Sequence, residues 1–326
     1  MNRLGLVSLS VAFLLAGCGR TEPGPPAGPG PRLARVVLQT DWFAEPEQGG
    51  FYEALAKGYY RDAGLDVVIR QGGPSAHPAT MVATGRADFG IDTSDDIILA
   101  VNRGVPLAML GAYMQRNPQA IMFHRESGIR SFRDLDGRTV MAVPSLPFIA
   151  VLENTFHIRM SVMPSDFGMS RFLADRNFVQ QCFVTDEPYY VRRQGADVGV
   201  LMISDAGYSP YSVWYATRGF LEHHADLARA FSQASIRGWR EFNRGDRAPA
   251  EGLIGSLNPR MDTEFMAYGA RAMREYRLVT GDSPTDDIIG RISRDRIAAE
   301  IRQLEAIGLL ERPLSVDDVF DPRFQP

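Results

Sequence analysis

The sequence is short of the features that mark nucleic-acid-binding proteins. Its 35 lysines and arginines are outnumbered by 39 acidic residues, which gives a net charge of -4. This balance excludes a basic nucleic-acid footprint and disfavours broad attraction to anionic membranes. The rest is ordinary globular composition, 45% hydrophobic and 23% charged. At roughly 100 to 200 residues per domain, a length of 326 residues predicts two domains.

Reactive and metal-binding motifs are also scarce. The two cysteines, Cys18 and Cys182, lack a metal-type spacing and are not expected to pair. The five histidines do not form a metal set, and there is no phosphate loop or nucleophile elbow. We therefore expect no metal, no cofactor and no catalytic residues, and the sequence predicts a protein that is not an enzyme.

The first segment has an apolar run that is too short to cross a bilayer, which takes about 20 residues. Arg3 precedes an apolar stretch over residues 4–15, and Leu15-Ala16-Gly17-Cys18 ends it. This pattern predicts a secretion signal over residues 1–17. The ending resembles the bacterial lipobox, which implies cleavage before Cys18 and lipidation of that cysteine. A plain signal peptide with an incidental cysteine is the alternative.

A segment rich in proline and glycine follows, GRTEPGPPAGPGPR over residues 19–32. Such a composition cannot form a packed element, so residues 18–33 are expected to be the lipidated cysteine and a flexible tether. The folded part is then expected outside the cytoplasm, held on a bacterial membrane through its lipid anchor. Which membrane carries the anchor stays open.

Beyond the tether, strand-like and helix-like segments alternate without an internal repeat. Strands are predicted at 35–41, 65–70, 89–91, 107–114, 139–143, 181–185 and 198–203, and a further apolar stretch covers 213–216. Helices are predicted at 50–60, 78–85, 95–103, 148–157, 169–175, 225–243, 262–276 and 295–308. This order is typical of an α/β fold whose helices cover mainly parallel sheets.

In open α/β sheets, ligands sit at the carboxyl ends of the strands. Five segments follow strands in this way: Asp41-Trp42-Phe43, Gly72-Gly73-Pro74-Ser75, Asp92-Thr93-Ser94, Pro144-Ser145 and Asp186-Glu187-Pro188. We expect a binding site to be assembled from them.

Several motifs occur together in a recognisable order. They are Asp41-Trp42, then AKGYYRDAGLDV over 56–67, GRADFG over 85–90, DLDGR over 134–138 and Asp186-Glu187-Pro188-Tyr189. The series resembles the periplasmic-binding family that includes binders of thiamine-pyrimidine precursors, sulfonates and nitrate. The pyrimidine-precursor branch usually has Asn-His-Thr-Gly shortly after the tryptophan, whereas this chain has EPEQGG over residues 45–50.

The resemblance implies the type 2 periplasmic-binding-protein fold, with two lobes joined by two crossings and a small molecule clamped between them. The first lobe would comprise residues 34–120 plus 213–326, and the second residues 121–212. The chain would act as a monomer and deliver its ligand to an ABC permease and its ATPase.

Candidate ligand-binding residues come from the post-strand segments. Trp42 can stack on a flat ring, although a core tryptophan is the alternative. Glycines 72 and 73 allow a close backbone approach beside Pro74 and Ser75, or form only a turn. Ser145 begins a helix after a strand, where backbone amides face a ligand.

Thr93 and Ser94 precede an apolar helix, so they either cap it or offer hydroxyls to a ligand. Glu187 and Asp186 are carboxylates that could accept hydrogen bonds from an aminopyrimidine-like ligand. Tyr189 would add a second aromatic wall, and Tyr211 lies at the predicted second crossing, where it would wall the cleft or pack the crossing strands.

The predicted function is an extracytoplasmic solute-binding component of an ABC importer, carrying a thiamine-precursor-like pyrimidine or another aromatic heterocycle. One alternative is a binder of sulfonate, taurine or nitrate-type anions. Alternatives of another class are a pyrimidine-synthase-like enzyme on the same fold and a sensory protein that serves a receptor.

Overall fold

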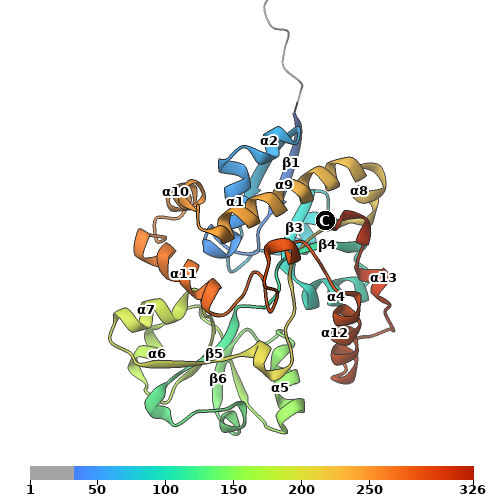
Figure 1. Cartoon of the computed structure of the whole chain (residues 1–326). Coiled ribbons are helices and arrows are strands. Elements are labelled where there is room, and N and C mark those ends of the chain that lie inside the picture. The colour runs from blue at the N-terminus through green and yellow to red at the C-terminus, as the bar shows by residue number, and fades with distance from the viewer. Residues whose placement is uncertain (1–32) are drawn as a thin grey trace, which may run out of the picture. The chain divides into compact units, whose positions relative to one another are not determined.

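The computed structural model describes residues 33–326, which form one compact unit. The predicted secretion signal, Cys18 and the tether to residue 32 lie outside the described residues. Within residues 33–326, no helix combines the length and apolarity that a membrane span requires. The described chain folds around two five-stranded sheets, one in the upper and one in the lower half of Figure 1.

The first sheet has the strand order β2-β1-β3-β10-β4. Strand β1 runs parallel to β2 and β3, while β10 is antiparallel to both β3 and β4. The strand bounds are β1 Ala34–Gln39, β2 Leu65–Arg70, β3 Phe89–Thr93, β4 Leu107–Met114 and β10 Ser212–Thr217. Strands β2 and β4 have the bounds that the sequence predicted.

The second sheet has the order β7-β6-β8-β5-β9. Strand β6 is parallel to β7 and β8, and β5 is antiparallel to β8 and β9. The strand bounds are β5 Gln119–His124, β6 Thr139–Ala142, β7 Ser161–Pro164, β8 Val179–Phe183 and β9 Val198–Met202. Each sheet thus has four strands in one direction and one reversed, which confirms the prediction of a two-lobed α/β fold with mainly parallel sheets.

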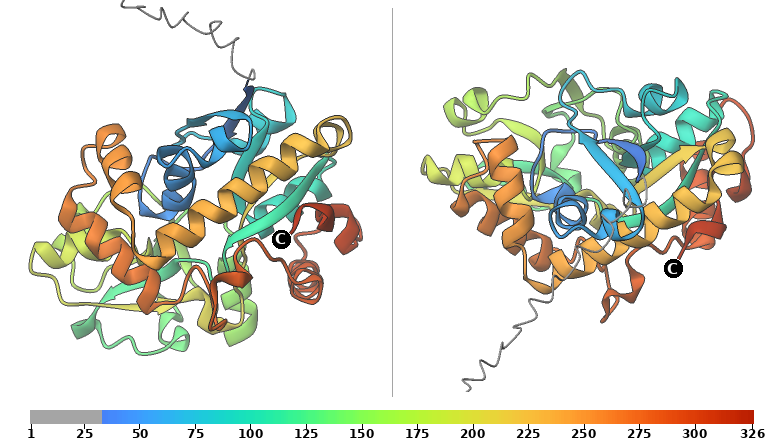
Figure 2. Two further views of the ribbon diagram at one scale, coloured as in Figure 1. Left: turned by 45° about the horizontal axis from the view of Figure 1, so that its top comes forward. Right: turned by 90° about the horizontal axis from the view of Figure 1, so that it is seen from above.

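Helices cover both faces of the first sheet (Figures 1 and 2). Helices α1, α2 and α9 share one apolar core with Val36, Leu38 and Phe89, whereas α3, α4 and α12 share another with Met109 and Tyr215. The alternation of side chains along a strand assigns neighbouring residues to opposite faces and so allows these two cores. The bounds on this lobe are α1 Gly49–Ala56, α2 Tyr59–Asp62, α3 Pro78–Ala83, α4 Ser94–Asn102, α8 Arg218–His223, α9 Ala225–Arg244, α10 Ala248–Leu257, α11 Thr263–Glu275, α12 Arg294–Ala306 and α13 Val316–Val319.

A third apolar cluster, which includes Ile121, Val140 and Leu152, lies in the second lobe. The helices there are α5 Phe148–Phe156, α6 Ser170–Ala174 and α7 Glu187–Arg193. The helix predicted over residues 50–60 is divided into α1 and α2, because Gly58 between them has a positive φ of 76° that ends the first helix.

Two segments join the lobes, residues 115–118 between β4 and β5 and residues 203–211 between β9 and β10. A single arginine of α12 ties them together. The Arg296 guanidinium donates to the carbonyl oxygens of Gln115, at 2.6 Å, and of Ser209, at 2.5 Å. It also lies 3.7 Å from the centroid of the Tyr211 ring. Both crossings are therefore anchored to the first lobe at one side chain.

The tightest helix contact in the first lobe joins α1 to α9 through glycines. A Cβ atom on Gly238 would lie 2.2 Å from the carbonyl oxygen of Gly50 and 2.7 Å from the amide nitrogen of Ala54. A Cβ on Gly50 would in turn lie 2.2 Å from the Trp239 ring. Only glycine lets these two backbones approach so closely.

We predict that Gly238→Ala lowers the free energy of unfolding by about 2–3 kcal/mol, because the added methyl group meets backbone that cannot move aside. Gly252→Ala is the matched control, since a Cβ there meets nothing within 4 Å in the exposed part of α10. It should raise stability by about 0.5–1 kcal/mol through helix propensity. Urea denaturation of both variants measures the difference, and equal effects would contradict the close-approach argument.

Candidate ligand-binding cleft

A cavity of about 580 Å³ lies between the two lobes. Its walls come from segments that follow strands of both sheets: Asp41 and Trp42 after β1, Thr93 at the end of β3, Ser145 after β6 and Asp186 after β8. The cavity therefore lies where the carboxyl ends of parallel strands face one another, as expected for an α/β binding site.

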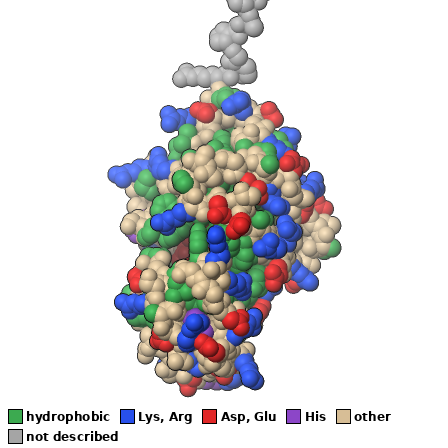
Figure 3. Space-filling model, turned by 90° about the vertical axis from the view of Figure 1, so that its left-hand side faces the viewer, with side chains coloured by type: hydrophobic (Ala, Val, Ile, Leu, Met, Phe, Trp, Pro, Cys, Tyr) green, Lys and Arg blue, Asp and Glu red, His purple; other side chains and the backbone are tan. Residues whose placement is uncertain are grey.

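Carboxylates dominate the charge of this cavity. Seven line it, namely Asp41, Glu45, Glu47, Asp92, Asp96, Asp186 and Glu187. The only basic side chains in its lining are Arg103 and His77. On one outer face of the described chain, by contrast, basic and acidic side chains are mixed (Figure 3). The excess of acidic side chains in the cavity lining contrasts with this mixed outer face.

Burial keeps several of these carboxyls easier to protonate than they would be in water. Desolvation raises the pKa of Asp41 to about 6 and that of Glu47 to about 7. Desolvation and the neighbouring Asp186 raise the pKa of Glu187 to about 8, and desolvation raises that of Asp186 to about 6. The pKa of Glu45 is raised by burial and then by the charge of Glu47.

Four polar atoms on the cavity wall are buried and have no hydrogen-bond partner among the described residues. They are Glu47 Oε2, Asn117 Nδ2, Gln180 Oε1 and Asp186 Oδ1. Buried polar groups are normally hydrogen-bonded, so unpaired ones in a cavity indicate where a ligand binds. Three of the four are acceptors, which favours a ligand that brings several N–H or O–H donors.

Two contacts cross the cleft. The Thr185 hydroxyl of the second lobe donates to a carboxylate oxygen of Glu47 in the first. The ring of Phe167, between β7 and α6, lies against that of Trp42, with 5.4 Å between centroids. Phe167 has a positive φ of 56°, and its turn is held by the Ser165 hydroxyl, which accepts from the Phe167 amide at 3.1 Å. An uncommon backbone conformation thus presents this aromatic ring to the opposite lobe.

Six of the ten residues predicted from sequence line the cavity: Trp42, Pro74, Thr93, Ser145, Asp186 and Glu187. Two of them also have local structural roles. The Thr93 hydroxyl donates to Asp96 at 2.9 Å, and the Glu187 carboxylate accepts from the Phe183 amide at 2.7 Å.

The other four residues lie away from the cavity. Ser94 is fully buried, donates its hydroxyl to both carboxylate oxygens of Glu300 at 2.8 Å and accepts from the Tyr211 amide. Tyr211 packs under Arg296, and its hydroxyl accepts from the Ser293 amide at 3.2 Å. These two residues therefore join the crossing to α12 rather than bind a ligand.

Tyr189 lies on the face of α7 that packs against α11. Its ring is 5.2 Å from that of Phe265, so it forms an interface between helices. Ser75 is exposed on the turn after Pro74 and is not part of the lining. Tyr189 and Ser75 were predicted as cavity residues from their positions in the sequence, which do not show the direction of a side chain.

Sequence reasoning missed Glu45, Glu47, Gln180 and Phe167 as cavity residues. The sequence does mark the two glutamates, because they belong to the EPEQGG segment that stands in place of the Asn-His-Thr-Gly of the pyrimidine-precursor branch. No signal was available for Phe167, since the short strand before it was not predicted.

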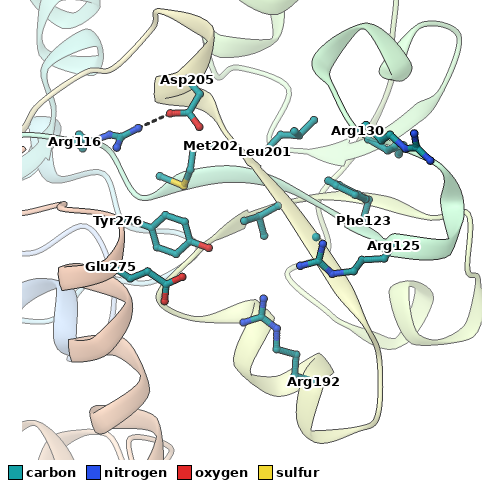
Figure 4. A pocket seen from close by; sticks show the side chains of 13 residues that line it. Arg116, Phe123, Arg125, Arg130, Arg192, Leu201, Met202, Asp205, Glu275 and Tyr276 are labelled. Atoms are coloured by element: carbon teal, nitrogen blue, oxygen red, sulfur yellow. Dashed lines mark hydrogen bonds and ion pairs between the residues drawn. The ribbon is translucent and has the colours of Figure 1, made fainter.

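A second hollow, of about 550 Å³, lies beside the edge strand β9 (Figure 4). Arg116, Arg125, Arg130 and Arg192 are among its lining residues. Two of these arginines are already paired with acids, Arg116 with Asp205 at 2.5 Å and Arg125 with Asp197 at 3.1 Å. Because it lies on the flank of one sheet and its cations are partly neutralised, we do not assign the solute to this hollow.

Residues 45–244 match the family described as NMT1/THI5 like. The chain belongs to this family. Two relatives align over most of their length. The riboflavin-binding protein RibY of Chloroflexus aurantiacus is 26% identical over 100% of this chain and 99% of its own. The formylaminopyrimidine-binding protein of Halalkalibacterium halodurans is 22% identical over 73% of this chain and 74% of its own.

Other similarities are shorter or are similarities of fold. A 4-amino-5-hydroxymethyl-2-methylpyrimidine phosphate synthase of Candida albicans is 28% identical over 41% of this chain and 39% of its own. The aliphatic sulphonate-binding protein SsuA of Escherichia coli superposes with a TM-score of 0.62 and 16% identity, covering 90% of this chain and 93% of that one. Family, fold and cleft together identify a solute-binding protein.

The raised carboxyl pKa values predict that stability of the ligand-free chain falls with rising pH. An acid whose pKa is higher in the folded state keeps its proton at pH values at which the unfolded chain has lost it. Its contribution to the free energy of unfolding is therefore full at low pH and is lost between about pH 4 and 8. Glu187→Gln keeps an acceptor for the Phe183 amide but removes the charge. We expect it to raise the free energy of unfolding at pH 8 by about 1–2 kcal/mol and to flatten the pH dependence.

Thermal denaturation between pH 5 and 8 measures this effect, with Glu305→Gln, an exposed position on α12, as the control. A wild-type melting temperature that rises across this window would contradict the prediction.

Proposed function

We propose that this chain is the solute-binding component of an ABC importer and that its solute is a flat, nitrogen-rich heterocycle of the pyrimidine type. The observation that carries the choice of solute is the set of buried acceptors, Glu47 Oε2, Gln180 Oε1 and Asp186 Oδ1, beside the half-buried ring of Trp42. An amino-substituted ring offers several N–H donors in one plane, and its face can stack on the tryptophan.

The relatives that align over most of the chain support this choice, since their names describe binders of a formylaminopyrimidine and of riboflavin. They also support a binding protein rather than an enzyme. An anionic solute is disfavoured by charge, because seven carboxylates and only Arg103 and His77 among basic residues line the cavity. A sulfonate or nitrate would meet few positive charges there and would be repelled by each carboxyl that is ionised.

We further propose that Cys18 carries the lipid anchor and that the lobes divide the folded chain into residues 34–120 plus 213–326 and residues 121–212. The two sheets support this division to within two residues, since β5 of the second sheet begins at Gln119 and β10 of the first sheet begins at Ser212.

The solute is tested by native mass spectrometry of the purified chain, followed by thermal-shift screening. We expect 4-amino-5-hydroxymethyl-2-methylpyrimidine or a related heterocycle to raise the melting temperature, because a ligand at 100 times its Kd adds about 2.7 kcal/mol of stability. Stabilisation by taurine and not by any heterocycle would overturn the proposal.

Trp42→Ala should weaken binding of the stabilising heterocycle at least about tenfold, or 1.4 kcal/mol, through loss of the stacked ring. Trp42→Phe should recover part of the affinity. Isothermal titration calorimetry measures both, and unchanged affinity in Trp42→Ala would remove this residue from the site.

Phe167→Ala should increase the dissociation rate of the same ligand, because it removes the aromatic contact between the lobes. Phe43→Ala is the matched control: Phe43 is also exposed and contacts Trp42, at 5.6 Å between centroids, but it comes from the first lobe and does not line the cavity. Stopped-flow measurement of Trp42 fluorescence compares the two variants, and equal rates would show that Phe167 has no special role.

A further inference from the structure

Four of the cavity carboxylates come from opposite lobes and face one another. Glu45 and Glu47 belong to the segment between β1 and α1 of the first lobe. Asp186 and Glu187 lie at the start of α7 in the second lobe. The hydrogen bond from Thr185 to Glu47 brings the two pairs together, because Thr185 directly precedes Asp186. Asp186 acts electrostatically on both Glu45 and Glu47, and Glu187 acts on Glu45.

This arrangement is unfavourable when all four groups are ionised. Two like charges 4 Å apart repel by about 4 kcal/mol at an effective dielectric constant of 20. The surrounding charged and titratable groups add little compensation. Asp41 adds negative charge, and the Tyr52 and Tyr190 phenols and the Cys182 thiol are neutral. Exposed Arg260 acts on Asp186. Among the described residues, no arginine or lysine forms a salt bridge with any of the four.

Two unpaired acceptor atoms indicate where a positively charged group of a ligand would bind. Glu47 is only 6% exposed, its Oε2 is unpaired, and Asp186 Oδ1 is unpaired on the opposite lobe. Both belong to the lining of the same cavity. A donor with a positive charge between these two atoms would hydrogen-bond to both lobes and would replace their repulsion by attraction.

We propose that Glu45, Glu47, Asp186 and Glu187 form a charge gate, so that the lobes close only when a positive charge on the solute, or protons on the carboxyls, lies between them. This inference rests on the proposed function and narrows it: the site prefers a cationic heterocycle, such as a ring-protonated aminopyrimidine, over a neutral or anionic molecule of the same shape. Binding of a fixed cation favours the ionised carboxylates and therefore releases protons. Affinity for such a cation falls as the pH is lowered and protons occupy the gate.

The gate is tested without a ligand by small-angle X-ray scattering of the chain from residue 33 onward, which forms one compact unit. We expect the radius of gyration to increase between pH 5.5 and 8.5 as the carboxyls ionise and the lobes open. Acrylamide quenching of Trp42 should increase in parallel, since Trp214 and Trp239 are both 0% exposed and contribute little change.

The double variant Glu47→Gln/Asp186→Asn keeps acceptors for Thr185 and for a ligand but removes one charge from each lobe. It should stay compact at both pH values. Glu305→Gln/Asp66→Asn, two exposed positions away from the cleft, is the matched control and should open like the wild type. A wild-type radius that does not change with pH, or a double variant that opens like the wild type, overturns the gate.

Charge selectivity is tested with 1-methylnicotinamide and nicotinamide, a flat cation and its neutral counterpart. We expect the cation to bind at least about tenfold more tightly, and the double variant to lose this preference. If heterocycles bind without regard to charge, the gate is wrong while the proposed function stands. If the lobes respond to pH as expected but no heterocycle binds, the gate stands and the proposed class of solute is wrong.

Discussion

The burial of carboxylates between two lobes is the constraint on which the cleft depends. A buried carboxylate needs hydrogen bonds, a counter-charge or a proton, because desolvation makes its ionised form costly. Here the protein supplies hydrogen bonds to some of these groups, as from Thr185 to Glu47 and from the Phe183 amide to Glu187. It supplies few positive charges. A bound molecule with a positive charge would supply the counter-charge that these carboxylates lack.

The first lobe provides the rigid base for this arrangement. Two apolar clusters, the first of which also includes second-lobe residues such as Met122 and Val184, fix the strands whose ends present the cavity residues. The glycine contact between α1 and α9 fixes the start of α1, which follows Glu45 and Glu47 in the chain. The crossings are also held by the first lobe, through Arg296.

The sequence predicted the fold well wherever hydrophobic pattern and turn residues agreed. Strands β2 and β4 lie between glycines or charged turns, and their bounds were predicted to the residue. Strand β5 was missed because its apolar run covers only residues 120–123, between Gln119 and His124, whereas the equally buried β4 has an apolar run of eight residues. Strand β7 was missed because it has four residues, none of them fully buried.

The residues predicted for the cleft fall into two groups, according to whether strand topology or side-chain packing sets their position. The post-strand rule found Trp42, Thr93 and Asp186, because topology alone brings the ends of parallel strands together. It could not separate Thr93, which lines the cavity, from Ser94, which bonds to Glu300 behind it. Neighbouring residues at a strand–helix junction point in different directions, and only packing decides which faces the ligand.

The buried pair of Ser94 and Glu300 links the cleft to the crossings. The Ser94 hydroxyl also accepts from the Tyr211 amide, and Glu300 lies one turn after Arg296 on α12. Next to Ser94 on α4, Asp95 accepts a hydrogen bond from Tyr208 at 2.5 Å in the second crossing. The helix that carries Asp96 into the cavity is therefore hydrogen-bonded to the second crossing. Ser94, Asp95 and Asp96 are consecutive at the start of α4, so one helix terminus contacts both the cavity and the second crossing.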